Sequence, residues 1–428
     1  MKNYLRITFF CFLLGSLIAV NNALSQETNM TFDELKAKVE GIDKNVTNLL
    51  NDVTGIKKLK ITGFIQFQFE KTESAKGFNV GGSNYSINPY DSTDEYVQAR
   101  YRIRRNFIKF EYNAGIAQLV AQMDFSNEKY SLKDAYINIT EPWLKYFSLK
   151  TGVFFRPSYD VQNSPANMEA IERTYMSSVL YPGERDLGAM LTVNPDKLFN
   201  LQMAAFNNTF GGQAKQYYPN FNSEPFYYMG RLTKDFMFKD LGLGFSLGAH
   251  ARIGNIVANT NKIIESDNNT GVIDSTSVKK GDKIGRNWYG VEAQVFVDVL
   301  EGLKLAGEYI FGSTTDEVTV DNSAAAPKPI RKRDFSGFYA TMGLNIIKEV
   351  MVAARYESFN PNTQIAGDNI IDTKDLTYST LGFGIHNTSF PNIRISLWYD
   401  MNMTKKHKTI MINDPVDNLL TLRIQFKY

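Results

Sequence analysis

The last eleven residues of the chain alternate strictly between apolar and polar side chains up to a terminal tyrosine. In a β-strand, Leu420, Leu422, Ile424, Phe426 and Tyr428 would share one face, and the polar residues between them would share the other. One such face suits hydrocarbon and the other suits water, as in the strands of a transmembrane β-barrel. The pattern therefore predicts a barrel with a pore rather than a soluble protein with an apolar core.

A period of two residues persists from residue 60 to the end and predicts sixteen strands. We place them near 60–70, 97–113, 115–125, 131–141, 147–156, 186–194, 199–207, 225–234, 241–253, 285–298, 302–312, 335–346, 350–359, 376–387, 391–403 and 418–428. Their connections alternate between short turns and long polar loops, of which 157–185 and 254–284 are examples. An even number of strands joined in this way is typical of outer-membrane barrels, and closure requires the first strand to pair with the last. We predict an all-β fold, a sixteen-stranded antiparallel transmembrane β-barrel over residues 60–428.

The N-terminus has the pattern of a secretory signal peptide. Lys2 and Arg6 precede an apolar run over residues 7–20, and the small residues Ala23 and Ser25 follow it. We predict a signal peptide over residues 1–25 that is removed after Ser25. The run is too short for a comfortable membrane-spanning helix.

Composition excludes two function classes. The single cysteine, Cys11, lies within the predicted signal peptide, so a mature chain would have no disulfides and no thiolate metal sites. Without Lys2 and Arg6, the 47 basic residues become 45, which equals the 45 acidic residues. A nucleic-acid partner would require a basic excess, and none is present.

Residues 26–59 predict a periplasmic helix. Apolar residues recur there at alternating gaps of three and four, as in a coiled-coil seam: Phe32, Leu35, Val39, Ile42, Val46, Leu49, Val53 and Ile56. The seam does not select cleanly between two and three strands. A single amphipathic helix packed on the barrel is the alternative interpretation.

Five segments of the predicted barrel are distinctive. They are Ile-Thr-Gly-Phe-Ile-Gln-Phe-Gln at 61–68, Arg-Ile-Arg-Arg at 102–105, Leu-Lys-Asp-Ala-Tyr-Ile-Asn-Ile at 132–139, Leu-Lys-Thr-Gly-Val-Phe-Phe-Arg-Pro at 149–157 and Tyr-Pro-Gly-Glu-Arg-Asp-Leu-Gly at 181–188. Together they resemble the phosphate-selective porin O and P family. The resemblance implies a homotrimer of sixteen-stranded barrels in the bacterial outer membrane, with the third external loop folded inward and small anions as solutes. Some family members also carry a short coiled coil ahead of the barrel. The arginine ladder of the phosphate-specific members does not align in full with this chain.

Three arginines at alternate positions are the first candidates for anion binding. Arg100, Arg102 and Arg104 would lie on one strand face about 7 Å apart from one to the next. Rows of guanidinium groups favour anions in a pore, and their planar fork suits phosphate oxygens. The apolar phase shifts after Arg104, which predicts a bulge near Arg105.

The alternative interpretation pairs these arginines with inward carboxylates and leaves no net selectivity. The candidate partners by strand phase are Asp124, Asp134, Glu292, Glu308 and Glu357. Sequence alone does not decide between the two.

A second candidate group surrounds the long loop at 157–185. Lys150 and Arg156 face inward by phase on the fifth predicted strand, and Arg185 lies at the loop's far end. Arg156 and Arg185 would make a constriction mildly anion-preferring, whereas Glu169 and Glu172 would oppose that preference.

We expect no enzymatic activity, cofactor or metal. Residues 244–248 fit the Gly-x-Ser-x-Gly pattern, but the segment continues as a predicted strand, and a nucleophile elbow requires a turn into a helix. His250, His386 and His407 are far apart in sequence and lack metal-ligand spacing.

We therefore expect passive diffusion of small anionic solutes, with phosphate or pyrophosphate as the leading solute. The alternatives are a general, weakly selective porin and a coiled-coil-bearing structural anchor of the outer membrane. A gated receptor is a further class, which would require a large N-terminal plug domain.

Overall fold

The computed structural model describes two units of the chain, residues 1–58 and 59–428. The described residues are 36, 38, 40–46, 58–72, 98–126, 129–196, 198–207, 222–223, 226–257, 262–266, 273–277, 279, 281–317, 330–367, 370, 375–403 and 418–428. Residues 40–46 are helical, with Ile42 and Val46 exposed. The predicted signal peptide and most of the predicted coiled coil lie outside the described residues.

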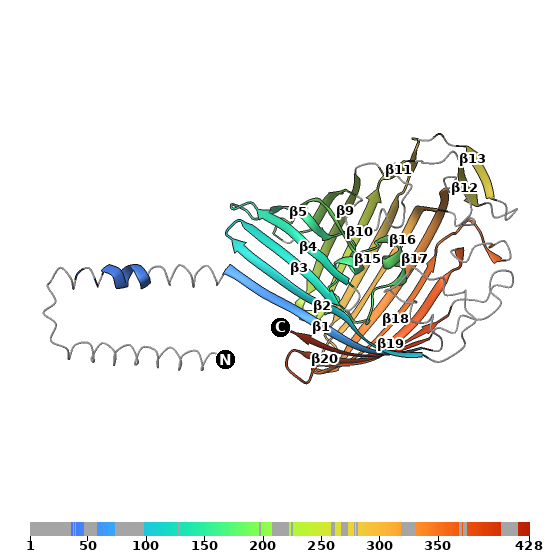
Figure 1. The fold of residues 1–428 in the computed structure, drawn as a ribbon. Helices are drawn as coiled ribbons and strands as arrows, with labels where there is room; N and C mark the ends of the chain where they lie inside the picture. The colour runs from blue at the N-terminus through green and yellow to red at the C-terminus, as the bar shows by residue number, and fades with distance from the viewer. Residues whose placement is uncertain are drawn as a thin grey trace. The chain divides into compact units, whose positions relative to one another are not determined.

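The second unit is a barrel of antiparallel strands (Figure 1). Within the described residues, its wall consists of β1 (Leu59–Thr72), β2 (Gln98–Ala114), β3 (Ala117–Ser126), β4 (Lys129–Thr140), β5 (Phe147–Phe155), β6 (Arg185–Val193), β7 (Asn200–Phe206), β9 (Tyr227–Phe238), β10 (Leu243–Ile253), β15 (Trp288–Val297), β16 (Leu303–Glu317), β17 (Ile330–Ile347), β18 (Val350–Asn360), β19 (Tyr378–Asn387), β20 (Ile393–Asn402) and β21 (Leu419–Lys427). Each strand pairs antiparallel with the next in this order. The sixteen predicted strands are confirmed.

Pairing of β1 with β21 closes the barrel. Their register runs from Phe64 opposite Lys427 to Thr72 opposite Leu419. Beyond it, the backbones of Gly63 and Tyr428 exchange two hydrogen bonds of 3.0 Å each. A side chain at position 63 would overlap the ring of Tyr428, so glycine allows the terminal tyrosine to cover the seam.

The two faces of the wall differ as the alternation predicts. On β21, Leu422, Ile424 and Phe426 are 39–46% exposed, whereas Thr421 and Arg423 are 1% and 4% exposed. Apolar side chains therefore form the outer surface, and polar side chains point into the barrel. No helix among the described residues is long and apolar enough to cross a membrane.

Further short strands arise in segments that the sequence predicts as loops. β8 (Asn222–Ser223), β11 (Asn255–Val257) and β14 (Lys283–Gly285) form a small three-stranded sheet. β12 (Lys262–Ser266) and β13 (Ile273–Ser277) form a hairpin, and β12 pairs parallel with β17. A 3-10 turn, η2 (Lys239–Leu241), connects β9 to β10.

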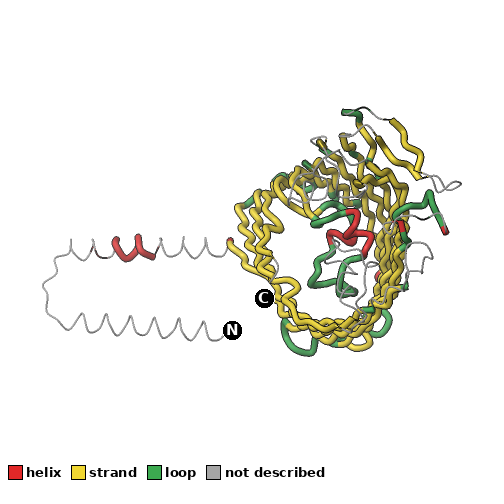
Figure 2. The backbone as a smooth tube through the Cα atoms, turned by 45° about the vertical axis from the view of Figure 1, so that its right-hand side comes forward, coloured by secondary structure: helices red, strands yellow, loops and turns green. Residues whose placement is uncertain are grey.

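The segment between β5 and β6 lies inside the barrel (Figure 2). It contains two short helices, α3 (Tyr159–Gln162) and α4 (Tyr175–Leu180). Their apolar side chains pack with large inward side chains of the wall in one buried cluster, which includes Phe154, Met176, Tyr181, Phe206, Trp288 and Phe335. The barrel interior is thus partly an apolar core that holds this segment in place.

Candidate functional site

The candidate site is the lumen between the strands β1–β7 and the inward segment, residues 156–184, which we call the inward loop. This arrangement agrees with the third-loop position that the family resemblance implies. Arg156 anchors the start of the loop, because its guanidinium binds Asp186 at 3.1 Å and the Tyr227 hydroxyl at 2.7 Å. Arg185 anchors the end through two hydrogen bonds to Asp134, of 2.9 and 3.2 Å.

Glu172, in the middle of the inward loop, is the main electrostatic attachment to the wall. Arg104 binds it through two hydrogen bonds of 2.9 Å, Arg105 binds it at 2.8 Å, and Arg423 of β21 also donates to it. Burial alone would raise the pKa of the Glu172 carboxyl, but the guanidinium groups of Arg104, Arg105 and Arg423 hold that pKa well below its usual range. Glu172 is therefore a carboxylate that neutralises one of the three arginine charges at this point.

Backbone carbonyls of the inward loop also accept hydrogen bonds from the wall. Arg394 donates to the Met168 carbonyl at 2.9 Å, and Arg423 donates to the Ile171 carbonyl at 2.6 Å. His386 lies 2.7 Å from the Glu169 carbonyl through Nε2. These contacts come from β19, β20 and β21, so the loop is fixed against that side of the barrel.

The predicted arginine row faces inward but is ion-paired. Arg100 and Arg102 contact Glu70 of β1 at 2.6 and 2.8 Å, and Arg104 contacts Glu172. The register between β1 and β2 shifts between Gln66 and Phe67, so that Arg104 has no opposite residue on β1. The predicted bulge therefore lies at Arg104, one residue before Arg105.

The carboxylates that pair with the arginine row are not the ones that the ion-paired interpretation proposes. Asp134, Glu292 and Glu357 are buried as the strand phase predicts, but they contact Arg185, Arg231 and Arg355. The partners of the predicted row, Glu70 and Glu172, were not among the expected carboxylates. Glu70 lies directly across from Arg100 in the β1–β2 register, so knowledge of the strand pairing would have identified it.

Lys150 differs from the predicted arginines, each of which pairs with a carboxylate. In the described part of the chain, its ammonium group contacts two aromatic rings instead. Its Nζ lies 4.7 Å from the centre of the Tyr136 ring and 5.6 Å from that of Phe154. Such cation–π contacts stabilise an ammonium group without neutralising its charge. The charge of Lys150 is therefore not paired with a carboxylate among the described residues.

Lys150 lines a cavity of about 450 Å³ between the inward loop and β1–β7. Lys109 and Lys427 line the same space, together with one carboxylate, Asp134. Asp134 is occupied by Arg185, and Lys109 contacts Glu111 at 2.6 Å. The alternation of the last strand predicts a lumenal position for Lys427. Neither Lys427 nor Lys109 is among the residues predicted to bind anions.

A second cavity of about 420 Å³ lies toward the short turns and shares Ala166 and Lys427 with the first. Its charged lining residues are Lys348, Glu349, Arg394 and Lys427. Counted once each over the described residues, five cationic and two carboxylate side chains line the two cavities, a surplus of three positive side chains.

No family model matches the chain, and no curated protein matches it either. Solved structures do match. The outer-membrane channel DcaP of Acinetobacter baumannii is 11% identical, with a TM-score of 0.53 over 86% of this chain and 97% of that one. The anion-selective porin from Comamonas acidovorans is 8% identical, with a TM-score of 0.52 over 86% and 99%. OprB of Pseudomonas putida is 13% identical, with a TM-score of 0.51 over 89% and 96%. At these identities the likeness shows that the fold is that of outer-membrane porins.

Proposed function

We propose that this protein is a porin of the bacterial outer membrane that admits small anionic solutes by passive diffusion. The observation that carries the proposal is the positive surplus around the two cavities that the inward loop leaves open. Charged rings and rows on a pore wall set the sign of the ions that pass. The apolar outer surface of the barrel supports a membrane location.

The ion pairs divide the lumenal cations into two groups. Arg104, Arg105 and Arg423 hold the inward loop through Glu172, which compensates one of their three charges, and none of the three lines either cavity. Lys150 and Lys427 line the open space, and their contacts are with aromatic rings and, at 3.4 Å, with the Asn167 side chain. We therefore assign the main anion-attracting role to the lysines and a positioning role to the arginines.

Phosphate is the leading solute within this proposal. It rests on the family resemblance and on the presence of several cations beside one small cavity. The porin from Comamonas acidovorans is named as anion-selective, which is consistent with this barrel type serving anions. A general, weakly selective porin is the second candidate, and the engagement of the predicted arginine row in ion pairs with Glu70 and Glu172 favours it.

Phosphate block of single-channel current tests the proposal. We expect phosphate to reduce the chloride current of the purified protein in a planar bilayer. Lys150→Glu should weaken this block at least about tenfold, equivalent to about 1.4 kcal/mol, because it replaces an attracting charge with a repelling one.

Lys145→Glu is the matched control, since Lys145 is exposed in the turn between β4 and β5. It makes the same charge change away from the lumen and should leave the block unchanged. Absence of phosphate block in the unaltered protein would favour the general porin. An equal effect of the two variants would remove Lys150 from the site.

A further inference from the structure

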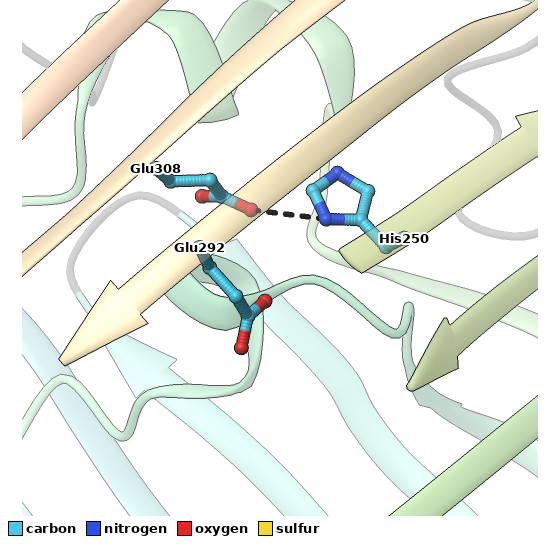
Figure 3. A group of neighbouring side chains, drawn as sticks. All are labelled: His250, Glu292 and Glu308. Atoms are coloured by element: carbon cyan, nitrogen blue, oxygen red, sulfur yellow. Dashed lines mark ion pairs between the residues drawn. The ribbon is translucent and has the colours of Figure 1, made fainter. Parts of the chain in front are cut away.

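We propose that His250, Glu292 and Glu308 form a binding site for a divalent transition-metal ion in the barrel wall. The three residues lie on the neighbouring strands β10, β15 and β16, and all are buried. Each can offer one ligand atom, and these atoms all lie within 4.8 Å of one another. Figure 3 shows the His250 ring and the Glu308 carboxylate facing each other, with Glu292 beside them.

Strand register brings these residues together. Glu292 and Glu308 are directly opposite each other, and His250 is opposite Gly290, two residues from Glu292. The Nδ1 atom of His250 lies 3.4 Å from Oε1 of Glu308. Ligands of a tetrahedral Zn²⁺ ion with bonds of about 2.0–2.1 Å are themselves about 3.3 Å apart, so this pair already has the required spacing.

Two glycines create the space in which the ligands converge. A Cβ atom at Gly290 would overlap the imidazole ring of His250, and one at Gly248 would lie 2.8 Å from Cγ, Cδ and Oε1 of Glu292. His250 and Glu292 thus each lean over the glycine directly opposite on the adjacent strand. Glycine in a strand interior weakens the strand and often marks a close approach of other groups, which here are the two ligand side chains.

Unsatisfied polar atoms point into the same space. His250 is only 3% exposed, yet neither of its ring nitrogens makes a hydrogen bond among the described residues. Glu308 accepts a hydrogen bond of 2.9 Å from the Ser158 hydroxyl at Oε1, while Oε2 has no donor. Buried polar groups are nearly always satisfied, so these atoms call for a partner such as an ion.

The local charge also calls for a cation. Arg231 binds Glu292 at 2.5 and 3.0 Å and neutralises one carboxylate. No lysine or arginine of the described residues lies within 4.0 Å of the Glu308 carboxylate. A bound divalent ion would neutralise it, and Glu292 keeps free lone pairs while bound to Arg231.

The donor set selects the class of metal. One imidazole nitrogen with two carboxylates suits Zn²⁺ and similar transition metals, whereas Ca²⁺ and Mg²⁺ prefer sites built of oxygen alone. Ser158 lies at the beginning of the inward loop, directly before α3. A metal here would therefore join three strands of the wall to the base of that loop. Sequence spacing did not reveal the cluster, because its members are brought together only by strand pairing.

The test is Zn²⁺ binding to the full-length purified protein after treatment with a chelator. We expect one Zn²⁺ per chain by elemental analysis, and competition with a coloured chelator should give at least about 100-fold weaker binding for His250→Asn. His386→Asn is the matched control. His386 is an equally buried lumenal histidine, but its nitrogens lie 2.7 Å from the Ser396 hydroxyl and the Glu169 carbonyl.

Co²⁺ in the unaltered protein provides a readout that does not depend on a variant folding. Bound Co²⁺ should give the intense visible absorption bands of an ion with a low coordination number and an imidazole nitrogen among its ligands. A spectrum of six-coordinate Co²⁺ with oxygen ligands only would overturn the proposal. Failure of the unaltered protein to retain Zn²⁺, or equal affinities of the His250 and His386 variants, would also overturn it and would leave a metal-free histidine–carboxylate pair.

Discussion

At the scale of single residues, Glu172 has the largest electrostatic role in the described lumen. It is a loop carboxylate that meets guanidinium groups from two strands that are adjacent to β1, namely β2 and β21. Removing one partner of a buried ion pair costs more than the pair contributes, because the remaining charges stay buried without a counterion. The position of the middle of the inward loop should therefore depend strongly on this carboxylate.

Glu172→Gln is expected to destabilise the loop by about 3–5 kcal/mol, the usual cost of breaking a buried ion pair. The arginines that lose their counterion would then be available to anions. Single-channel recordings should show greater current noise and stronger anion preference, and limited proteolysis should cut within residues 156–184. Glu169→Gln is the control, because Glu169 contacts a single partly exposed cation, Lys304. Recordings and cleavage identical to those of the unaltered protein would contradict the role given to Glu172.

At the scale of elements, the bulge in β2 determines which side chains of that strand face inward. Arg102 and Arg105 are both buried although they are three residues apart, which a regular strand does not permit. Arg104 is the extra residue that allows it. The bulge thus brings an additional arginine to the lumen and within reach of Glu172.

Deletion of Arg104 should therefore be tolerated. The strand would return to regular alternation with Arg102 and Arg105 still inward, and one ion pair would be lost. Ile108 instead pairs regularly with Gly63 and Met123. Its deletion would turn the side chains on one side of the deletion to the opposite face of the sheet. Heat-dependent gel migration should show a folded barrel for the first variant only. A folded barrel in both cases, or in neither, would count against this view of β2.

The elements of the wall were predictable from sequence, and the contacts within the lumen were not. A two-residue period identifies a strand locally, and the phase change near Arg105 reveals the bulge in the same way. The pairing of Glu172 with Arg423 joins residues 251 positions apart and depends on how the inward loop folds. α3 and α4 have four and six residues, too few for a helical period to be recognised. The His250 cluster likewise depends on register across three strands.

At the scale of the whole molecule, we predict that the barrels assemble through the segment that precedes them. All sixteen strands of the wall lie within the unit from residue 59 to 428 in the described chain. The apolar heptad positions between Phe32 and Ile56 predict association of helices, and the family resemblance implies a trimer.

If these helices assemble a trimer as predicted, deletion of residues 27–58 should leave the barrel folded and yield monomers where the full chain yields trimers. Light scattering after gel filtration in detergent measures the mass directly. Replacing Ile42 and Val46 with Asn is a milder variant that should have the same effect, since both lie on the predicted seam. A trimer that persists after the deletion would place the assembly contacts on the barrel wall instead.

We expect the lysines that are not paired with carboxylates to give the open part of the lumen a net attraction for anions. The measurement that tests it most directly is the reversal potential of the unaltered protein in a planar bilayer across a gradient of potassium chloride. We expect a reversal potential of the sign that chloride permeation produces. Its magnitude should be larger at low ionic strength, where the lumenal charges are less screened. A potential of the sign that potassium permeation produces would contradict it.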